Sequence, residues 1–439
     1  MLLALLLAAT PAPVPAMSVE AQTFRLDNGL TVIISPEHKV PGVVVDILYD
    51  VGSRDEEKGR TGFAHLFEHL MFMGARYVPY PGFDTLMEQY GGRNNASTSN
   101  DITRYYETGP SNLLEMFLWM ESDRMATLSR EMTAEKLQAQ RLIVLNERRQ
   151  SYENRPYGMG ELAIYENLFP QGHPYSWPVI GSSQDLEAAQ LEDVINFFNK
   201  WYAPSNAILS IVGDVDPREA AALVRKYFDF LPKQPKPSHP SYPPVKLEAE
   251  KRVRLTDQVE LPKVTLSWPT PPLTQEGDAD FDVLSQVLAS GKASRLYQKL
   301  VHEQQLASEV SALQESMSLQ SVFHIEVTGT PGSTPEQLMK AADAVVAQLK
   351  AEGPTQAEVD SARLLITTGT ARNLESLLGR ADLLNAMQRL YGDPTALDKD
   401  LARYARVTPE TARAAAAKYL TSGRVVIEVV PATAAGEGK

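Results

Sequence analysis

A proline-rich segment close to the midpoint of the chain limits how its 439 residues can fold. Residues 232–244 hold six prolines, separated mainly by Lys, Ser and Gln, and contain almost no apolar side chain. Because proline fixes φ and lacks an N–H, this segment cannot be a helix or a central strand, and we expect an extended linker over 232–245. A surface loop inside one large domain is the alternative, although such long loops without secondary structure are uncommon.

Similar units occur on both sides of the linker, which predicts a weak internal duplication. In each half an amphipathic helical pattern is followed by an apolar strand pattern. Several predicted helices have a proline in their first turn, where its missing N–H costs nothing. The clearest units are the helix 191–202 with the strand 207–212, and the helix 408–419 with the strand 424–430.

Strand patterns at 31–34, 43–49 and 264–268 alternate with long helical patterns, which indicates the α+β class. We expect two homologous lobes, each a mainly antiparallel sheet flanked by helices, arranged as half of a clamshell around a cleft or chamber. The predicted boundaries are 1–22 for a signal or disordered N-terminus, 23–231 for the first lobe, 232–245 for the linker, 246–432 for the second lobe and 433–439 for a disordered tail.

An apolar run at the N-terminus is followed by small residues and prolines up to Ala16. At about eight residues the run is too short to span a bilayer. It is similar to the core of a secretory signal cleaved after Ala16, although no Lys or Arg precedes it. We therefore expect a periplasmic or secreted protein, with a trimmed or mis-started N-terminus as the alternative. No later segment is long and apolar enough to predict a membrane span.

Charge and cysteine content exclude several classes of function. The chain has 42 Lys and Arg against 55 Asp and Glu, and it lacks the basic stripe expected of a nucleic-acid binder. It has no cysteine, which excludes disulfides, thiol catalysis, thiolate zinc sites and iron–sulfur clusters. Any metal must therefore be bound by His, Asp, Glu or water.

Residues 61–74 predict an amphipathic helix that carries a candidate metal site. The apolar side chains that recur at helical spacing are Phe63, Leu66, Phe67, Leu70 and Met71. His65, Glu68 and His69 fall on the opposite side of this helix, one turn apart, and Gly74 is expected to end it.

This H-x-x-E-H pattern suits hydrolytic zinc chemistry. Two imidazoles one turn apart can both reach a Zn²⁺ ion at ~2.0–2.1 Å, and the adjacent Glu68 can take a proton from water. The pattern is the inverzincin signature. An accidental arrangement of two surface histidines and a glutamate is the alternative reading.

A catalytic zinc site needs a third protein ligand. Glu147 is the best candidate, in a helix for which Thr133 is the expected N-cap. The surrounding Asn-Glu-Arg-Arg stretch is equally typical of a solvated helix face, so periodicity alone leaves the role of Glu147 open.

Several motifs resemble the pitrilysin family of zinc metallopeptidases, which includes insulin-degrading enzyme and the mitochondrial processing peptidase. The matching segments are 62–74 (GFAHLFEHLMFMG), 91–98 (GGRNNAST), 103–106 (TRYY), 143–147 (IVLNE), 173–178 (HPYSWP) and 202–207 (YAPSNA). They occur in family order and cover most of residues 23–232, whereas the second half matches loosely, chiefly at 294–296.

The resemblance implies roles for individual residues. His65, His69 and Glu147 correspond to the ligands of one zinc ion per chain, and Glu68 corresponds to the general base. Residues 23–231 would then form the catalytic domain. His173 lies in a stretch rich in proline and aromatic residues, and we expect it to be packed or exposed, not a ligand.

The resemblance also implies a substrate-binding strand that contains Asn95, Ala96 and Thr98. In the family the matching strand pairs with the peptide substrate, and the asparagine contributes its amide. Backbone pairing of this kind tolerates many peptide sequences, because the ladder reads no side chains. A purely structural edge strand remains the alternative.

Two departures from the family pattern affect the expected activity. Gln140 stands where many members have a second glutamate that supports the zinc site. Active members also carry an Arg and a Tyr seven residues apart in the second half, where this chain has Val301 and Ser308. Arg295 and Tyr297 are nearby, but their spacing places them on different helix faces.

The resemblance and its departures together predict a zinc endopeptidase with a split site. It would hydrolyse peptides or unfolded segments, bound as an added strand in a closed chamber, in a heterodimer whose related partner supplies the Arg and the Tyr. A non-catalytic assembly subunit of the same family and a zinc-storage module are the alternatives.

Overall fold

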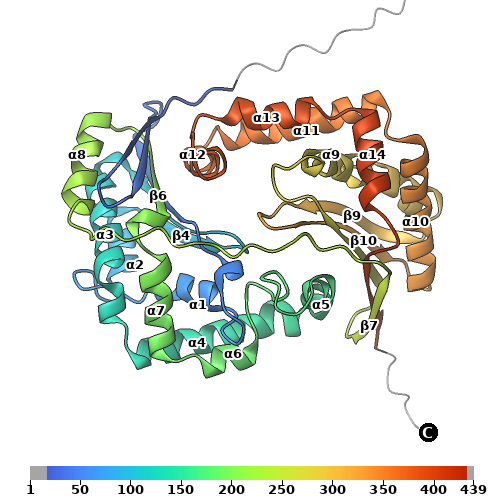
Figure 1. Cartoon of the computed structure of the whole chain (residues 1–439), viewed down its shortest axis with the longest axis horizontal. Coiled ribbons are helices and arrows are strands. Elements are labelled where there is room, and N and C mark those ends of the chain that lie inside the picture. The colour runs from blue at the N-terminus through green and yellow to red at the C-terminus, as the bar shows by residue number, and fades with distance from the viewer. Residues whose placement is uncertain (1–16, 433–439) are drawn as a thin grey trace, which may run out of the picture.

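The computed structural model describes residues 17–432 and contains two lobes, each built on one β-sheet (Figure 1). The predicted signal with cleavage after Ala16 and the predicted tail 433–439 lie outside the described residues. Residues 17–21 precede the first strand, and among them the Val19 side chain is buried. Within 17–432, no helix combines the length and apolar character needed to cross a membrane.

The first lobe contains a six-stranded sheet in the order β1-β2-β6-β3-β5-β4. The strands are β1 (Gln22–Arg25), β2 (Thr31–Pro36), β3 (Gly42–Tyr49), β4 (Arg93–Thr98), β5 (Thr103–Pro110) and β6 (Ala207–Gly213). Only the β2–β6 pair is parallel. The central strand β3 is buried almost throughout, whereas β4 lies at the sheet edge and alternates exposed and half-buried residues. β4 and β1 are therefore the two edge strands of this sheet, and within the described residues β4 pairs on one side only, with β5.

The first half of the chain contains eight α-helices, several of which pack on this sheet. They are α1 (Phe63–Leu70), α2 (Gly82–Tyr90), α3 (Leu114–Glu131), α4 (Ala134–Arg148), α5 (Gly158–Leu168), α6 (Ser183–Ala188), α7 (Leu191–Trp201) and α8 (Pro217–Phe228). α3 packs on β3, α8 on β2, and α1 and α2 on β4. α1 also packs against α4, which brings two distant parts of the sequence together.

The second lobe repeats the arrangement with a five-stranded sheet in the order β7-β11-β8-β10-β9. The strands are β7 (Lys251–Asp257), β8 (Lys263–Thr270), β9 (Ala307–Glu315), β10 (Ser321–Gly329) and β11 (Val425–Pro431). Only β7 and β11 pair in parallel. This order and these directions match β2-β6-β3-β5-β4 of the first lobe, so the prediction of two homologous, mainly antiparallel lobes is confirmed.

The helices of the second half are α9 (Asp278–Ala289), α10 (Pro335–Glu352), α11 (Gln356–Asn373), α12 (Leu377–Tyr391), α13 (Leu397–Ala405) and α14 (Pro409–Tyr419). The helices and strands expected around 191–212 and 408–430 are present as α7, β6, α14 and β11. The prolines at the starts of α8, α10 and α14 stand in the first turn, where the sequence predicts them.

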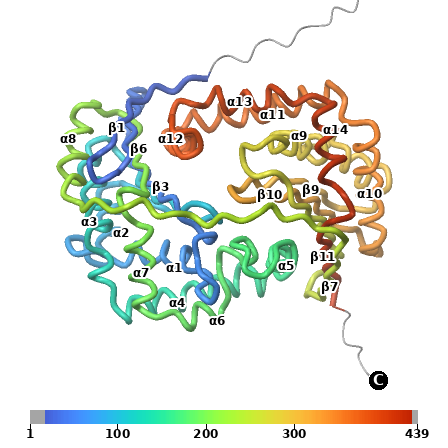
Figure 2. Tube along the Cα trace, viewed as in Figure 1, coloured from blue at the N-terminus to red at the C-terminus, as the bar shows by residue number. Residues whose placement is uncertain are grey.

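Each lobe receives one helix from the other half of the chain. α5 packs on β7, β8 and β11 of the second sheet, and α12 packs on β3 and β6 of the first (Figure 2). Ile164 and Leu168 of α5 share a buried cluster with Ile427, while Leu384 of α12 shares another with Val212. Burial of such apolar surface is the main favourable term in folding, so these clusters join the lobes independently of the linker.

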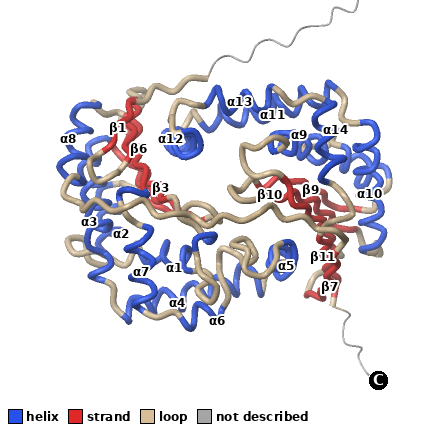
Figure 3. The backbone as a smooth tube through the Cα atoms, viewed as in Figure 1, coloured by secondary structure: helices blue, strands red, loops and turns tan. Residues whose placement is uncertain are grey.

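Residues 232–245 form no helix or strand and run as an extended strap between the two lobes (Figure 3). His239 of the strap lies against the first lobe, with its Nδ1 2.8 Å from Asp55 Oδ1 and its Nε2 3.1 Å from Asp50 Oδ2. Val245 N donates to the side chain of Gln320 in the second lobe. The strap is thus tied to both lobes.

Candidate metal centre

The helix α1 carries the H-x-x-E-H pattern, as the sequence predicts. Its apolar side chains Phe63, Leu66, Phe67 and Leu70 are buried in the first lobe. His65, Glu68 and His69 lie on the less buried side. The helix ends at Leu70, earlier than the predicted end at Gly74, because the chain already turns at residues 71–74. Gly74 itself has a φ of 83° and lies against the backbone of Tyr80, where a Cβ would not fit.

The N-terminus of α1 is held by the buried carboxylate of Glu56. The Gly62 N–H donates to one of its oxygens at 2.9 Å, and the Ala64 N–H donates to the other at 2.8 Å. Burial raises the pKa of Glu56 well above its ordinary value, while these two donors act in the opposite direction. A carboxylate at this position satisfies N–H groups that have no partner within the helix.

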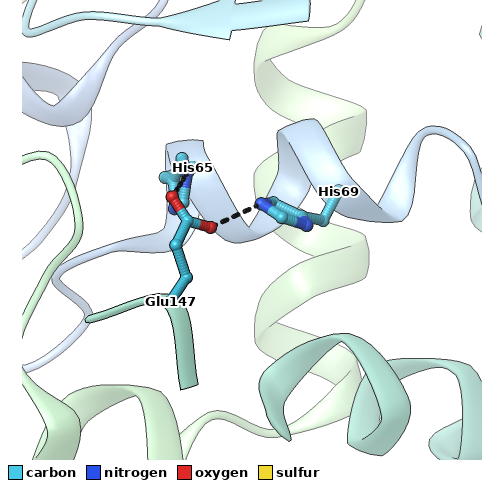
Figure 4. Close-up of side chains that lie close together, drawn as sticks. All are labelled: His65, His69 and Glu147. Atoms are coloured by element: carbon cyan, nitrogen blue, oxygen red, sulfur yellow. Dashed lines mark ion pairs between the residues drawn. The ribbon is translucent and has the colours of Figure 1, made fainter. Parts of the chain in front are cut away.

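Glu147 approaches both imidazoles from α4. Its Oε1 lies 3.6 Å from His65 Nε2, and its Oε2 lies 3.2 Å from His69 Nε2 (Figure 4). The helix begins as predicted, with the Thr133 side chain accepting from Lys136 N. A π-helical segment, Arg149–Glu153, follows α4 directly. Because α4 packs on α1, the third carboxylate meets the two histidines although it lies far along the chain.

These three residues fit the ligand set of zinc. One ligand atom from each of His65, His69 and Glu147 lies within 4.8 Å of the others. Ligand atoms about 2.0–2.2 Å from a tetrahedral zinc lie roughly 3.3–3.6 Å apart, close to the 3.6 and 3.2 Å that separate each imidazole nitrogen from one oxygen of Glu147. Burial lowers the pKa of His65 to about 4, which keeps this ring in the neutral form that binds metals.

The carboxylate of Glu68 lies beside this group and has a specific partner. The Thr98 hydroxyl, from the end of β4, donates to Glu68 Oε2 at 2.5 Å. Burial raises the pKa of Glu68, and the bond from Thr98 and the nearby His69 partly offset this rise. A carboxylate with a raised pKa beside a metal site is suited to accept and return a proton.

Family models match both halves of the chain. Residues 31–174 match "Insulinase (Peptidase family M16)", and residues 188–365 match "Peptidase M16 inactive domain". The Helicobacter pylori protein named "Zinc protease PqqE" is 34% identical over 363 residues, which cover 81% of this chain and 80% of that protein. The chain belongs to peptidase family M16. The resemblance to the pitrilysin family is thereby confirmed, and the four residues described above all lie in the first match.

Solved structures of M16 proteins share the fold. The crystal structure of a Helicobacter pylori protease is 30% identical in sequence and superposes with a TM-score of 0.86. The match covers 94% of this chain and 100% of that protease chain. The periplasmic protease PqqL of Escherichia coli is 19% identical with a TM-score of 0.77. That match covers 94% of this chain but 48% of PqqL, and at this identity it shows the fold alone.

The residues that the M16 resemblance assigns to substrate binding lie on the edge strand β4. Ala96 packs against the core of the first lobe, and Thr98 contacts Glu68. Asn95 is exposed, and its Oδ1 accepts from Ala96 N at 2.8 Å. The structure therefore places these three residues on one strand with three different side-chain environments.

Gln140 is the residue at which the resemblance leads us to expect a supporting glutamate. It is buried, and its amide nitrogen lies 2.7 Å from Met73 Sδ. The amide therefore faces the segment that follows α1. His173, which the sequence predicts to be packed or exposed, is buried and stacks on Phe169.

In the second lobe, Val301 and Ser308, at the positions where the resemblance leads us to expect an Arg and a Tyr, make contacts of their own. Val301 packs against the apolar core, and the Ser308 hydroxyl donates to the Gly329 carbonyl at 2.9 Å. Arg295 forms a two-point ion pair with Glu358, with both N–O distances at 2.7 Å. None of these side chains is available to stabilise a developing oxyanion.

Sequence reasoning missed two contacts of the site, the cap of α1 by Glu56 and the bond from Thr98 to Glu68. Glu56 precedes the helix by a turn of irregular chain, so no periodic pattern marks it. The resemblance places Thr98 on the substrate strand, and its contact with Glu68 depends on the packing of β4 against α1, which no local pattern indicates.

Proposed function

We propose that this chain is a zinc-dependent endopeptidase. His65, His69 and Glu147 would hold one Zn²⁺ ion, and Glu68 would act as the general base. The observation that carries the proposal is the convergence of three ligand atoms within 4.8 Å, beside a carboxylate on the same side of α1. The names of the M16 relatives, several of which are called zinc proteases, support the same reading.

The residues of this chain would act mainly by proton transfer and orientation. Zinc bound in such a site lowers the pKa of water and polarises a carbonyl group. Glu68 would accept the proton of the attacking water and return it to the leaving amine. Since Thr98 engages Oε2 of Glu68, Oε1 is the oxygen that would carry this proton. The neutral His65 and the charged Glu147 would keep the ligand set in its binding form.

Peptides would bind as an added strand on the open edge of β4. This edge lies next to α1, so a peptide paired there would pass close to Glu68. Backbone pairing would make the enzyme tolerant of sequence. Peptides and unfolded segments would fit such a site in a closed chamber, whereas folded proteins would be excluded by size.

We propose that a related subunit completes the site. The positions of the missing Arg and Tyr hold Val301 and Ser308, and Arg295 is committed to Glu358. Removing one oxyanion donor typically costs on the order of 10²-fold in rate or more. The chain matches about half the length of PqqL, which suits a protein that works as one half of a pair.

The export of this subunit remains part of the proposal. Its N-terminal apolar run is similar to the core of a secretory signal, although no Lys or Arg precedes it, and the structurally similar PqqL is described as periplasmic.

A non-catalytic assembly subunit is the second candidate, favoured by the match of residues 188–365 to an M16 inactive domain. The complete metal group in the first lobe argues against it, because a scaffold has no use for His65, Glu68 and His69 together.

Zinc content and peptidase activity, measured on wild type and Glu68→Gln, test the proposal. The complex should be isolated from its host through a tag on this chain, so that a partner is retained and identified by mass spectrometry. We expect about one zinc per chain in both proteins and hydrolysis only in wild type. Absence of zinc-dependent hydrolysis in the wild-type complex would refute the enzyme assignment, and full turnover by the isolated chain would refute the need for a partner.

A further inference from the structure

We propose that Thr98 is a positioning residue for the general base, which couples the edge strand β4 to Glu68. This inference rests on the proposed function and deepens it. It assigns the Thr98 side chain to the enzyme's own base, in place of the substrate contact that the sequence suggests. Thr98 would act through Glu68 and would not touch the peptide with its hydroxyl group.

The contact itself is short and directed. Thr98 Oγ1 donates to Glu68 Oε2 at 2.5 Å, the distance of a strong hydrogen bond to a charged acceptor. Glu68 is partly buried, which limits the competition of water for this oxygen. A glutamate side chain has several rotatable bonds, and a fixed donor on one oxygen restricts the position of the other.

The backbone that carries Thr98 is held firmly. Thr98 is the last residue of β4 and pairs with Thr103 of β5. In the turn that follows, Ser99 N donates to Ile102 O at 2.8 Å, and Arg54 N donates to Asn100 O at 2.9 Å. Threonine is also stiff at χ1 because it is β-branched. The hydroxyl therefore has a defined position relative to α1.

The Thr98 side chain points away from the edge of β4 on which a peptide would pair. Alternate residues of a strand point to opposite faces, and Ala96, two residues earlier, packs into the core of the first lobe. Thr98 lies on the same face, toward α1, whereas Asn95 and Ser97 on the other face are exposed. Peptide pairing would use the backbone of β4 and leave the Thr98 hydroxyl on Glu68.

β4 would therefore have two roles, because it would pair with the peptide substrate and also orient the general base Glu68. A peptide added to its edge would be placed by the same strand that orients Glu68 Oε1. Loss of the hydroxyl should therefore affect the chemical step more than peptide binding. A misplaced catalytic group typically lowers the rate with little change in ground-state binding.

Kinetics of three variants in the isolated complex provide the first test. Thr98→Val removes the hydroxyl with little change of shape, and Thr98→Ser restores it. Thr395→Val is the matched control, because Thr395 Oγ1 also donates to a carboxylate, Asp393, in an exposed loop of the second half. We expect kcat to fall about tenfold for Thr98→Val with KM within about twofold, near wild-type values for Thr98→Ser, and no change for the control. A raised KM with unchanged kcat would overturn the proposal.

Thermal unfolding of the zinc-free chain provides a second test that needs no activity. Thr98→Val should lower the Tm in the wild-type background but not in a Glu68→Ala background, because the bond is then already absent. Equal shifts in both backgrounds would overturn the proposal. An inactive wild-type complex would refute the proposed function, but the Tm shifts in the two backgrounds could still be compared. Failure of the proposed function and failure of this inference are therefore distinguishable.

Discussion

At the scale of single residues, Glu147 differs from neighbouring acidic residues in its partners and not in its exposure. Its side chain is 38% exposed, close to the 36% of Glu153 at the end of the π-helical segment that follows α4. Glu153 pairs with Arg148, whereas Glu147 faces His65 and His69. A hydrogen bond from His69 lowers the pKa of Glu147, so this carboxylate is charged at neutral pH. Its partners therefore distinguish the proposed ligand Glu147 from an ordinary surface acid.

We expect Glu147→Ala to lower zinc affinity by more than about 100-fold, because losing even an outer partner of a metal ligand costs roughly 10- to 100-fold. Competition with a fluorescent chelator would measure this affinity. Glu153→Ala, which removes a carboxylate of similar exposure, is the control and should bind zinc like wild type. Equal affinities for wild type and Glu147→Ala would remove Glu147 from the ligand set.

Glu56 caps the N-terminus of α1 by accepting hydrogen bonds from the N–H groups of Gly62 and Ala64. Glu56→Gln keeps the shape but replaces one acceptor oxygen by an amide donor, which leaves the N–H of Gly62 or Ala64 unpaired. We expect a loss of about 1–3 kcal/mol in the free energy of unfolding, the usual cost of a buried unpaired group. Urea unfolding monitored by circular dichroism would measure it. Glu57→Gln, one residue further in an exposed position, is the control.

At the scale of elements, the side chain of His239 holds the strap against the first lobe. This ring stacks on Trp201 and lies between the carboxylates of Asp50 and Asp55, with Arg54 Nη2 3.2 Å from its Nδ1. Burial alone would lower the pKa of His239, but the two carboxylates outweigh it and raise the pKa above the ordinary value. The protonated ring is therefore favoured in the folded state.

This raised pKa predicts a pH-dependent contribution to stability. The contribution is fully present below the unfolded pKa of about 6.5 and is lost as the pH rises through the higher folded value. The stability gap between wild type and His239→Gln should therefore be larger at pH 6 than at pH 9. Urea unfolding at both pH values would measure the gap, and an equal gap at the two values would contradict the prediction. His38→Gln, an exposed histidine paired with Asp214, is the comparison.

At the scale of the whole molecule, the exchange of α5 and α12 makes the two lobes interdependent. Each sheet is covered on one side by a helix from the other half, and buried apolar clusters cross between the lobes. A flexible linker alone would permit the lobes to hinge. The exchanged helices oppose such motion, so opening of a chamber is expected between subunits and not within this chain.

Leu384→Ala tests this interdependence. Leu384 is fully buried between α12 and the first sheet, and its truncation should cost about 2–5 kcal/mol. Calorimetry should show one unfolding transition for the whole chain, shifted as a unit in the variant. Leu364→Ala, at a position 63% exposed on α11, should shift it little. Two separate transitions, only one of them shifted, would show that the lobes unfold independently.

The sequence by itself determined the features that depend on near neighbours along the chain. Helical periodicity placed His65, Glu68 and His69 on one side of α1, and the proline content of 232–245 excluded regular structure there. Repeated helix and strand units revealed two lobes of one fold. Such patterns are readable because turn geometry and backbone restrictions act over a few residues.

The tertiary structure alone decided the contacts between distant segments. The packing of α4 on α1 brings Glu147 to the histidines, and the position of β4 places the Thr98 hydroxyl against Glu68. The exchanged helices α5 and α12 hold the two lobes together. The family motif pointed to Glu147, but its helix pattern was equally typical of a solvated face. These contacts depend on the order of the strands and on the faces along which the helices pack. Both are set by the burial of apolar surface in the whole molecule and not by neighbours along the chain.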